Sequence, residues 1–336
     1  MSLPVKAEKV QNNQAARSPL ARFGRKWGAQ LGIVAVALVV WLTFLIAAPR
    51  TFLSGQIYQA FMQTTPLFAM MALPLTMVVI AGEMDLSFIS VMAWGVAIYV
   101  IVLNATGSIF LGFIACLLAG LFAGIINGLL VVRIGMPSLV ATIGTQFFWS
   151  GVVLVISNGK GASLVSAVGT PIYNIMVGRV GVVPGQMFWT IIIAAACWFF
   201  LNRTKAGGHV YLIGDNIDSA RLMGVNVDAR KIMVFAIVGV AAAFTGLTAS
   251  YEVTYYWPTL GAGYLLQTLA SVFLGGTSVF GGAGTIFGTF VASFVIGAIN
   301  AGIVAAGLTG FWTQLIYGCI VVISVSIQTL LGKRLR

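Results

Sequence analysis

The chain has 336 residues, of which 18 are Lys or Arg and seven are Asp or Glu, so its formal net charge is +11 at pH 7. Only 7% of the residues are charged and 60% are hydrophobic, whereas a soluble domain has about 25% charged residues. This composition excludes a soluble enzyme, a disordered chain and a secreted disulfide scaffold, and it indicates an integral membrane protein.

Long segments without charge predict the helices. Residues 86–132 and 253–332 contain no charged residue, and a helix needs about 20 apolar residues to cross the hydrocarbon core. Uninterrupted apolar runs favour helices over the alternating strands of a barrel. The predicted fold is an all-α polytopic membrane protein. Its ten predicted crossings are residues 28–48, 58–80, 86–103, 109–132, 138–156, 187–201, 232–252, 264–280, 285–306 and 311–331.

The basic residues predict the orientation. Ten crossings place both termini on one side, and the positive-inside rule favours the cytoplasm. Residues 1–27 are then a basic, polar cytoplasmic tail near the membrane surface, 28–332 form the transmembrane domain, and 333–336 form a basic cytoplasmic tail. The inside residues are Lys6, Lys9, Arg17, Arg22, Arg25, Lys26, Arg133, Arg203, Lys205, Arg221, Arg230, Lys231, Lys333, Arg334 and Arg336, and the outside residues are Arg50, Lys160 and Arg179.

Three acidic residues lie near membrane depth: Glu83, Asp85 and Glu252. Proton pumps carry chains of acids within their spans, so this small set argues against a proton-coupled pump. The sequence leaves two interpretations of Asp85 and Glu252 open. They hydrogen-bond the hydroxyl groups of a passing solute, or they are solvated at the ends of spans.

Small residues predict close packing and a turn. Gly120, Gly124 and Gly128 recur every four residues, so they line one helix face and let a neighbouring backbone approach. The glycine-rich segment 275–284 separates the predicted eighth and ninth helices. We expect a sharp or re-entrant turn there, because irregular backbone at membrane depth must be buried or line a cavity.

A short internal similarity relates the two halves of the chain. Asn127 and Asn300 end the same pattern, G-x-I-N, on helices predicted to run in opposite directions. Inverted repeats are a common plan in transporters, so two inverted halves and a chance match both stay open. An interhelical hydrogen bond is the simplest role for these amides.

The polar segment 202–231 is predicted to be a cytoplasmic element that meets a soluble partner. Asp215 is expected to cap a short helix, with Asp218 three residues further on. Gly224 is expected to end that helix after about eight residues, too few to be stable alone in water. It must therefore lie against something. The alternative is a solvated loop that only joins two spans.

Several kinds of chemistry lack the residues that they need. His209 is the only histidine, so it is interpreted as a surface residue, and no zinc site, haem site or catalytic triad is expected. No G-x-x-x-x-G-K-[ST] segment is present, so another chain must do any ATP-driven work. Cys116, Cys197 and Cys319 fall within predicted spans and are expected to be packing residues. We expect neither enzyme activity nor a metal or cofactor in this chain.

Aromatic residues follow the predicted seventh helix at its outer end, at Tyr255, Tyr256 and Trp257. Such rings suit stacking on a sugar, and they equally suit the aromatic belt at a membrane–water interface. The sequence leaves both interpretations open.

Three ordered motifs resemble those of ribose-type sugar permeases of ABC importers. The first is GEMDLS at 82–87, where the family pattern is closer to G-G-I-D-L-S. The second is GGHVYLIGDN at 207–216, followed by ARLMGV at 220–225. The third is LASVFLGGTSVFGGAGTIFG at 269–288. With the matching length, the resemblance covers most of the chain.

The resemblance implies a permease of the bacterial inner membrane that imports a sugar or a similar polyhydroxylated solute. It implies four kinds of partner: a second permease subunit in a homo- or heterodimer, a cytoplasmic ATPase that uses ATP, an external solute-binding protein and the lipid bilayer, with no nucleic acid. Segment 202–231 would couple the ATPase to transport. The residues expected to do so are Gly214, Asp215, Asn216, Ala220, Arg221 and Gly224.

Two departures from the family pattern leave the substrate open. Glu83 stands where the family has a small residue, and Tyr251–Pro258 lacks the arginine often found there. The rival function is an ion-coupled secondary transporter or a channel for a small polar solute; a membrane-embedded enzyme would need a cluster of catalytic groups that the sequence lacks. The candidates for the translocation path are Glu83, Asp85, Asn127, Glu252, Tyr256, Trp257 and Asn300.

Overall fold

The protein is a bundle of long helices with short strands at one end. The computed structural model describes residues 19–305 and 310–335. Its helices are α1 (Pro19–Ala47), α2 (Pro49–Phe52), α3 (Gly55–Ile80), α4 (Phe88–Thr106), α5 (Ile109–Val132), α6 (Ser138–Ser157), η1 (Val165–Ala167), α7 (Pro171–Val177), α8 (Gly185–Arg203), α9 (Lys205–Asp215), α10 (Ile217–Leu222), α11 (Val227–Glu252), η2 (Ala262–Tyr264), α12 (Leu265–Leu274), α13 (Ile286–Ala305) and α14 (Gly310–Leu335). Its strands are β1 (Ala162–Ser163), β2 (Arg179–Val180), β3 (Val183–Pro184) and β4 (Tyr255–Tyr256).

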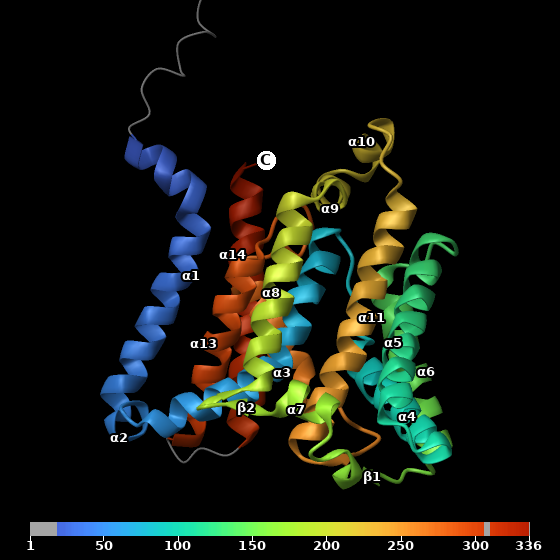
Figure 1. Cartoon of the computed structure of the whole chain (residues 1–336). Helices are drawn as coiled ribbons and strands as arrows, with labels where there is room; N and C mark the ends of the chain where they lie inside the picture. The colour runs from blue at the N-terminus through green and yellow to red at the C-terminus, as the bar shows by residue number, and fades with distance from the viewer. Residues whose placement is uncertain (1–18, 306–309, 336) are drawn as a thin grey trace, which may run out of the picture.

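Nine of the described helices are long and apolar enough to cross a membrane. They are α1, α3, α4, α5, α6, α8, α11, α13 and α14. Helices suit lipid because all their backbone groups bond within the segment. The predicted all-α polytopic fold is therefore confirmed. The start of α1 and the end of α14 lie at the same end of the bundle as α9 and α10 (Figure 1).

Helix α3 is the centre of the bundle. Residues 65–80 of α3 are all buried, including Pro66 and Pro74, whereas only 6% of the residues in the spans of α1 and α14 are buried. The hydroxyls of Thr76 on α3 and Thr289 on α13 lie 2.8 Å apart in this interior. Exposed apolar side chains on the outer helices match a lipid surround.

The predicted eighth crossing, residues 264–280, is wrong in extent. Helix α12 has only ten residues and ends at Leu274, and residues 275–285 are not helical. The helix stops early because Gly276 adopts a left-handed φ of +85°, which glycine tolerates. A Cβ on Gly275 would also lie only 2.6 Å from the backbone N of Thr289. The expected turn at the glycine-rich segment is thus present, and it begins earlier than predicted.

Two other helices begin earlier than predicted, although the apolar span of α1, Gln30–Ala47, agrees with the predicted crossing 28–48. Helix α1 begins at Pro19, inside the expected tail 1–27; residues 1–18 of that tail lie outside the described residues, as does Arg336 of the expected C-terminal tail. Helix α11 begins at Val227 and not at 232, because the Asn226 side chain caps it by accepting from the Ala229 N–H at 3.0 Å. The remaining long helices agree with the prediction to within a few residues.

Helices α5 and α11 pack closely, as the glycine spacing predicted. A Cβ on Gly128 would lie 2.7 Å from Cα of Ile232, and one on Gly124 would lie 2.9 Å from Cα of Ala236. Glycine lets the two backbones approach this closely. The seam holds α11, which carries part of the site described below, against α5.

The end of the bundle away from α9 is closed by two small antiparallel sheets (Figure 1). Strand β1 pairs with β4, so Ala162 lies opposite Tyr256, and β2 pairs with β3. All three cysteines are free; Cys116 and Cys197 are buried, as expected of packing residues, while Cys319 is exposed.

Candidate functional site

Three segments far apart in the sequence meet at the end of α3. Gly282 donates its N–H to the carbonyl of Ile80 at 2.9 Å. A Cβ on Gly281 would lie 2.8 Å from the carbonyl oxygen of Gly214 and 2.9 Å from Cα of Gly82. We call Gly82, Gly214, Gly281 and Gly282 the glycine junction. Each of the three sequence motifs supplies at least one of its residues.

Helix α9 is attached to the bundle at both ends. At its start, the Thr204 hydroxyl donates to the carbonyl of Phe200 on α8 at 2.7 Å and caps α9 by accepting from the Gly207 N–H at 3.0 Å. Near its end, the Tyr211 hydroxyl donates to the carbonyl of Gly284 at 2.9 Å, and Gly214 contacts the carbonyl of Ile80 so closely that no side chain fits there. A displacement of α9 must therefore move α3 and the glycine-rich segment with it.

Helix α10 is capped by Asn216 and not by Asp215, which corrects the prediction. Asn216 Oδ1 accepts from the Ser219 N–H at 2.8 Å, whereas Asp215 is the last residue of α9. Asn216 has the extended backbone that a cap needs, with φ −156° and ψ 110°. The cap lies one residue later than predicted, and α10 has six residues and not eight.

Gly224 ends α10, as predicted. Its φ is +78°. Its N–H donates to the backbone carbonyl of Arg221 at 2.9 Å, and the Val225 N–H donates to the backbone carbonyl of Ala220 at 3.0 Å. These two bonds form a Schellman motif. Ala220 and Val225 are buried with Ile213 and Val227 in a small core. This core fixes α10 against α9 and the start of α11.

The tip of α10 presents apolar side chains to solvent. Leu222 is 90% exposed and Met223 is 68% exposed, and Asp218 and Arg221 beside them are also exposed. The tip projects beyond the ends of α8 and α11 (Figure 1). An exposed apolar surface with a polar rim is typical of a protein-binding site.

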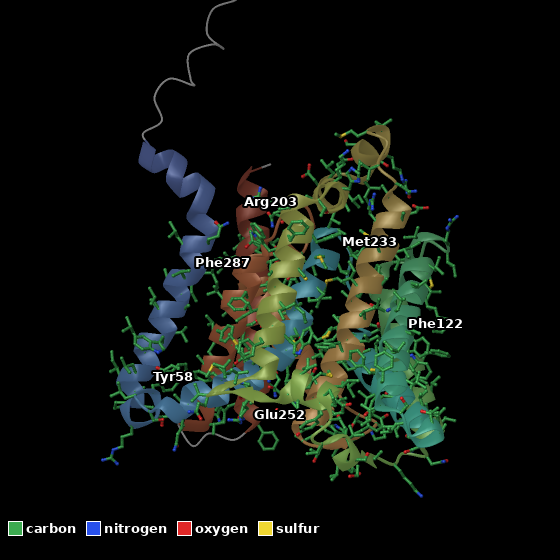
Figure 2. The ribbon with its side chains drawn as sticks, in the orientation of Figure 1. Tyr58, Phe122, Arg203, Met233, Glu252 and Phe287 are labelled. Carbon is green, nitrogen blue, oxygen red and sulfur yellow. The ribbon has the colours of Figure 1, made fainter. Side chains whose placement is uncertain are left out.

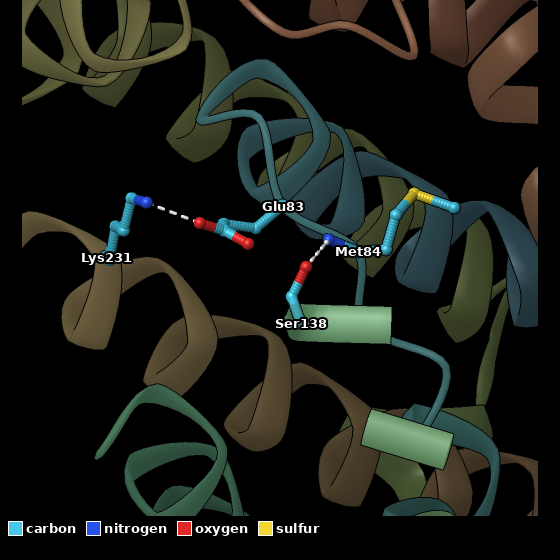
Figure 3. Close-up of polar contacts among 4 residues, drawn as sticks. All are labelled: Glu83, Met84, Ser138 and Lys231. Atoms are coloured by element: carbon cyan, nitrogen blue, oxygen red, sulfur yellow. Dashed lines mark hydrogen bonds and ion pairs between the residues drawn. The ribbon is translucent and has the colours of Figure 1, made fainter. Parts of the chain in front are cut away.

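The connection 81–87, which joins α3 to α4, is held by two other helices (Figure 3). Glu83 forms an ion pair with Lys231 of α11, and both side chains are almost fully buried. Met84 donates its N–H to Ser138 Oγ at 3.0 Å and accepts from Thr142 Oγ1 at 3.3 Å, both on α6. Since Gly82 belongs to the glycine junction, this connection joins α9 mechanically to α6 and α11.

Asp85 and Ser87 of the same connection form a buried polar cluster with Asn127 of α5. Asp85 is 1% exposed, and its carboxylate accepts from the Ser87 N–H at 2.8 Å and the Ser87 hydroxyl at 2.7 Å. Asn127 of α5 donates to that hydroxyl at 2.6 Å. Burial raises the pKa of Asp85, while the bonds from Ser87 act in the opposite direction. Asp85 is therefore not solvated at the end of a span.

The remaining translocation candidates lie elsewhere. Glu252, at the far end of α11 (Figure 2), accepts a hydrogen bond from the buried Gln186 of α8. Tyr256 is buried in β4, and its hydroxyl has no partner among the described residues. Trp257 and Asn300 are half-buried. The structure thus separates the predicted candidates into groups at different depths and does not bring them together.

The sequence does not predict four residues whose side chains bond to the site residues or to the glycine-rich segment. They are Lys231, Ser138, Gln186 and Tyr211. One signal was available, because an acid at membrane depth such as Glu83 calls for a cationic partner. Lys231 was nevertheless placed outside the helix, and only the earlier start of α11 brings it next to Glu83.

Comparisons with known proteins point to one class. Residues 57–325 match the family described as branched-chain amino acid transport system / permease component. The chain is similar to the ribose import permease protein of Escherichia coli strain K12, with 26% identity over 311 residues that cover 91% of this chain and 97% of the relative. It is also similar to the autoinducer 2 import system permease protein LsrD of Photorhabdus laumondii, with 30% identity over 312 residues that cover 90% of this chain and 91% of the relative. The ribose import permease protein of Haemophilus influenzae is 27% identical over 307 residues, which cover 89% and 93% of the two chains.

Proposed function

This chain belongs to the ABC-importer permease family described as branched-chain amino acid transport system / permease component, and we propose that its solute is a sugar or a similar polyhydroxylated molecule. The named import permeases that support this proposal carry ribose and autoinducer 2 and match almost their full length. Branched-chain amino acids, from the family description, are the alternative solutes that a substrate test must separate.

Permeases of this family are multi-pass inner-membrane proteins that act with an ATPase and a binding protein. We propose that the α9–α10 end and both termini are cytoplasmic and that two permease subunits pair. The basic residues of 202–231 support this orientation. The ATPase then meets α10, and the binding protein docks at the end that carries β1 and β4.

The observation that carries the proposal is the exposed tip of α10, which the small core around Ala220 and Val225 holds against α9 and α11. Leu222 and Met223 are the apolar contacts that a cleft on the ATPase would receive. ATP is hydrolysed in that partner, and this chain receives the resulting movement. The close contacts of the glycine junction leave no space for α9 to slide along the end of α3. The movement therefore passes from α9 to the connection 81–87 and on to α6 and α11.

The candidates at the two ends have different proposed roles. Glu83, Asp85 and Asn127 already have partners within the protein, so they position the inner end of the path and do not bind solute in this conformation. Glu252, Tyr256 and Trp257 lie towards the outer end and are the proposed solute contacts, and Asn300 stays a candidate on α13.

The test is transport by the reconstituted complex. Proteoliposomes that contain the permease, its ATPase and its binding protein should take up labelled ribose in an ATP-dependent manner. The variant Leu222→Asp/Met223→Asp should lose ATPase association and uptake, because two carboxylates would have to be buried unpaired at the contact. Leu53→Asp is the matched control, since Leu53 is also exposed but precedes α3 at the opposite end.

The rival functions give different results in the same assay. Uptake that needs an ion gradient and survives omission of the ATPase would identify a secondary transporter. Unlabelled autoinducer 2 or leucine is then added to compete with the uptake of labelled ribose. Inhibition by autoinducer 2 would indicate a sugar-like solute, and inhibition by leucine would indicate an amino acid.

A further inference from the structure

A groove of about 650 Å³ runs between α5, α8 and α11, beside α3, within the part of the bundle that crosses the membrane. Its lining is apolar and includes Leu117, Leu121, Trp189, Ile193, Ile237 and Phe244. The indole N–H of Trp189 donates to the carbonyl of Ile175 at 2.9 Å and is therefore satisfied outside the groove. A polar solute would find no hydrogen-bonding partners on this lining, whereas a hydrocarbon chain needs none.

The end of the groove nearest α9 carries a cation. Met233, Ile237 and Phe244 line the groove, and Arg230 precedes Met233 by three residues, so it lies on the same face of α11 one turn nearer to α9. Arg230 is half-buried, and its Nε is buried without a hydrogen-bond partner among the described residues. A buried N–H donor that lacks an acceptor is costly. It indicates that an acceptor from outside the chain completes this site.

Helix α9 adds further polar groups at the same end. It packs against both α8 and α11, and it carries His209, whose Nδ1 is also buried without a partner among the described residues. The exposed Lys205 begins this helix. Helix α9, which carries these nitrogen groups, therefore packs against two of the helices that line the apolar groove, at the same end as Arg230.

We propose that this groove binds an anionic phospholipid of the inner leaflet. Its acyl chain lies against α5, α8 and α11, and its phosphate accepts hydrogen bonds from Arg230. Basic pockets between membrane helices on the cytoplasmic side bind such headgroups. The choice of leaflet rests on the proposed orientation of the chain, but the site itself does not depend on which solute is carried.

The test measures contact between the lipid chain and Trp189. The full-length protein is placed in phosphatidylcholine nanodiscs in which a fraction of the phosphatidylglycerol, or of the phosphatidylcholine, carries bromine near the ends of its acyl chains, because Trp189 lines the part of the groove farthest from α9. Bromine quenches tryptophan on contact, and the variant Trp189→Phe isolates the contribution of Trp189. Brominated phosphatidylglycerol should quench this contribution at about a fivefold lower mole fraction than brominated phosphatidylcholine, as expected for one basic contact.

Two arginine variants identify the headgroup contact. Arg230→Gln should remove the preference for phosphatidylglycerol, and Arg230→Lys should retain part of it. The control Arg133→Gln, at an exposed arginine that follows α5, should keep it fully.

The proposal is overturned if both brominated lipids quench Trp189 equally in the unsubstituted protein, or if the preference persists in Arg230→Gln. Absence of quenching by either lipid would also overturn it, because the groove would then be covered by protein. The measurement needs neither ATPase nor solute, so its failure is distinguishable from failure of the transport function.

Discussion

At Gly214 the backbone of α9 lies directly against the end of α3 and against Gly282. We expect Gly214→Ala to force these segments apart, at a cost of about 1–3 kcal/mol for overpacking. Solute-stimulated ATP hydrolysis by the reconstituted complex should fall, while basal binding of the ATPase to the α10 tip is retained. The measurements are ATPase activity and thermal unfolding in detergent.

Gly208→Ala is the matched control, because Gly208 lies on the same helix with no atom near its added methyl group. It should leave activity unchanged and favour the helix slightly. Equal effects of the two substitutions would contradict the role of the glycine junction.

The ion pair between Glu83 and Lys231 is buried, which makes it sensitive to loss of one partner. Glu83→Met or Lys231→Met alone should lower the free energy of unfolding by about 3–5 kcal/mol, because each leaves an unpaired buried charge. The double variant should recover most of that loss, since an apolar pair can replace a buried ion pair.

A double-mutant cycle of unfolding in SDS measures this coupling. Additive losses in the double variant would show that the two side chains do not act as a pair. If stability is recovered while transport is not, the ion pair serves movement of the connection 81–87 and not only its stability.

Among the elements, the seam between α5 and α11 depends on glycine at one face. Gly124→Ala would place a methyl group 2.9 Å from Cα of Ala236, so we expect it to destabilise the protein by about 1–3 kcal/mol. Gly144→Ala on α6 is the control, because no atom lies near its added methyl group, and it should be neutral or stabilising by up to about 1 kcal/mol. Unfolding in SDS compares them, and a neutral Gly124→Ala would show that the seam tolerates separation.

At the scale of the whole molecule, the orientation decides whether α10 can meet an ATPase. Single cysteines at Asp218→Cys and Lys160→Cys, both at exposed positions, are introduced into a chain whose three native cysteines are replaced. A membrane-impermeant maleimide should label position 160 in intact cells and position 218 only in inverted vesicles. Labelling of position 218 from outside would remove the basis of the coupling proposal.

The amino-acid sequence by itself determined the class of this protein and all but one of the predicted places where it crosses the membrane. Hydrophobic length and the positions of Lys and Arg are local properties, and lipid admits few backbone conformations other than the helix. The glycine spacing on α5 and the stop at Gly224 were predictable for the same reason, since each follows from the backbone of one element.

The tertiary structure decided which residues meet. Asp215 and Asn216 are both good capping residues, and the close contact at Gly214 places the bend so that Asn216 becomes the cap. The partners of Glu83 and Glu252 come from α11 and α8, and α12 is short because Thr289 lies against Gly275. Such contacts join residues far apart in the chain, so they depend on how whole helices pack, which no local pattern of hydrophobicity or charge contains.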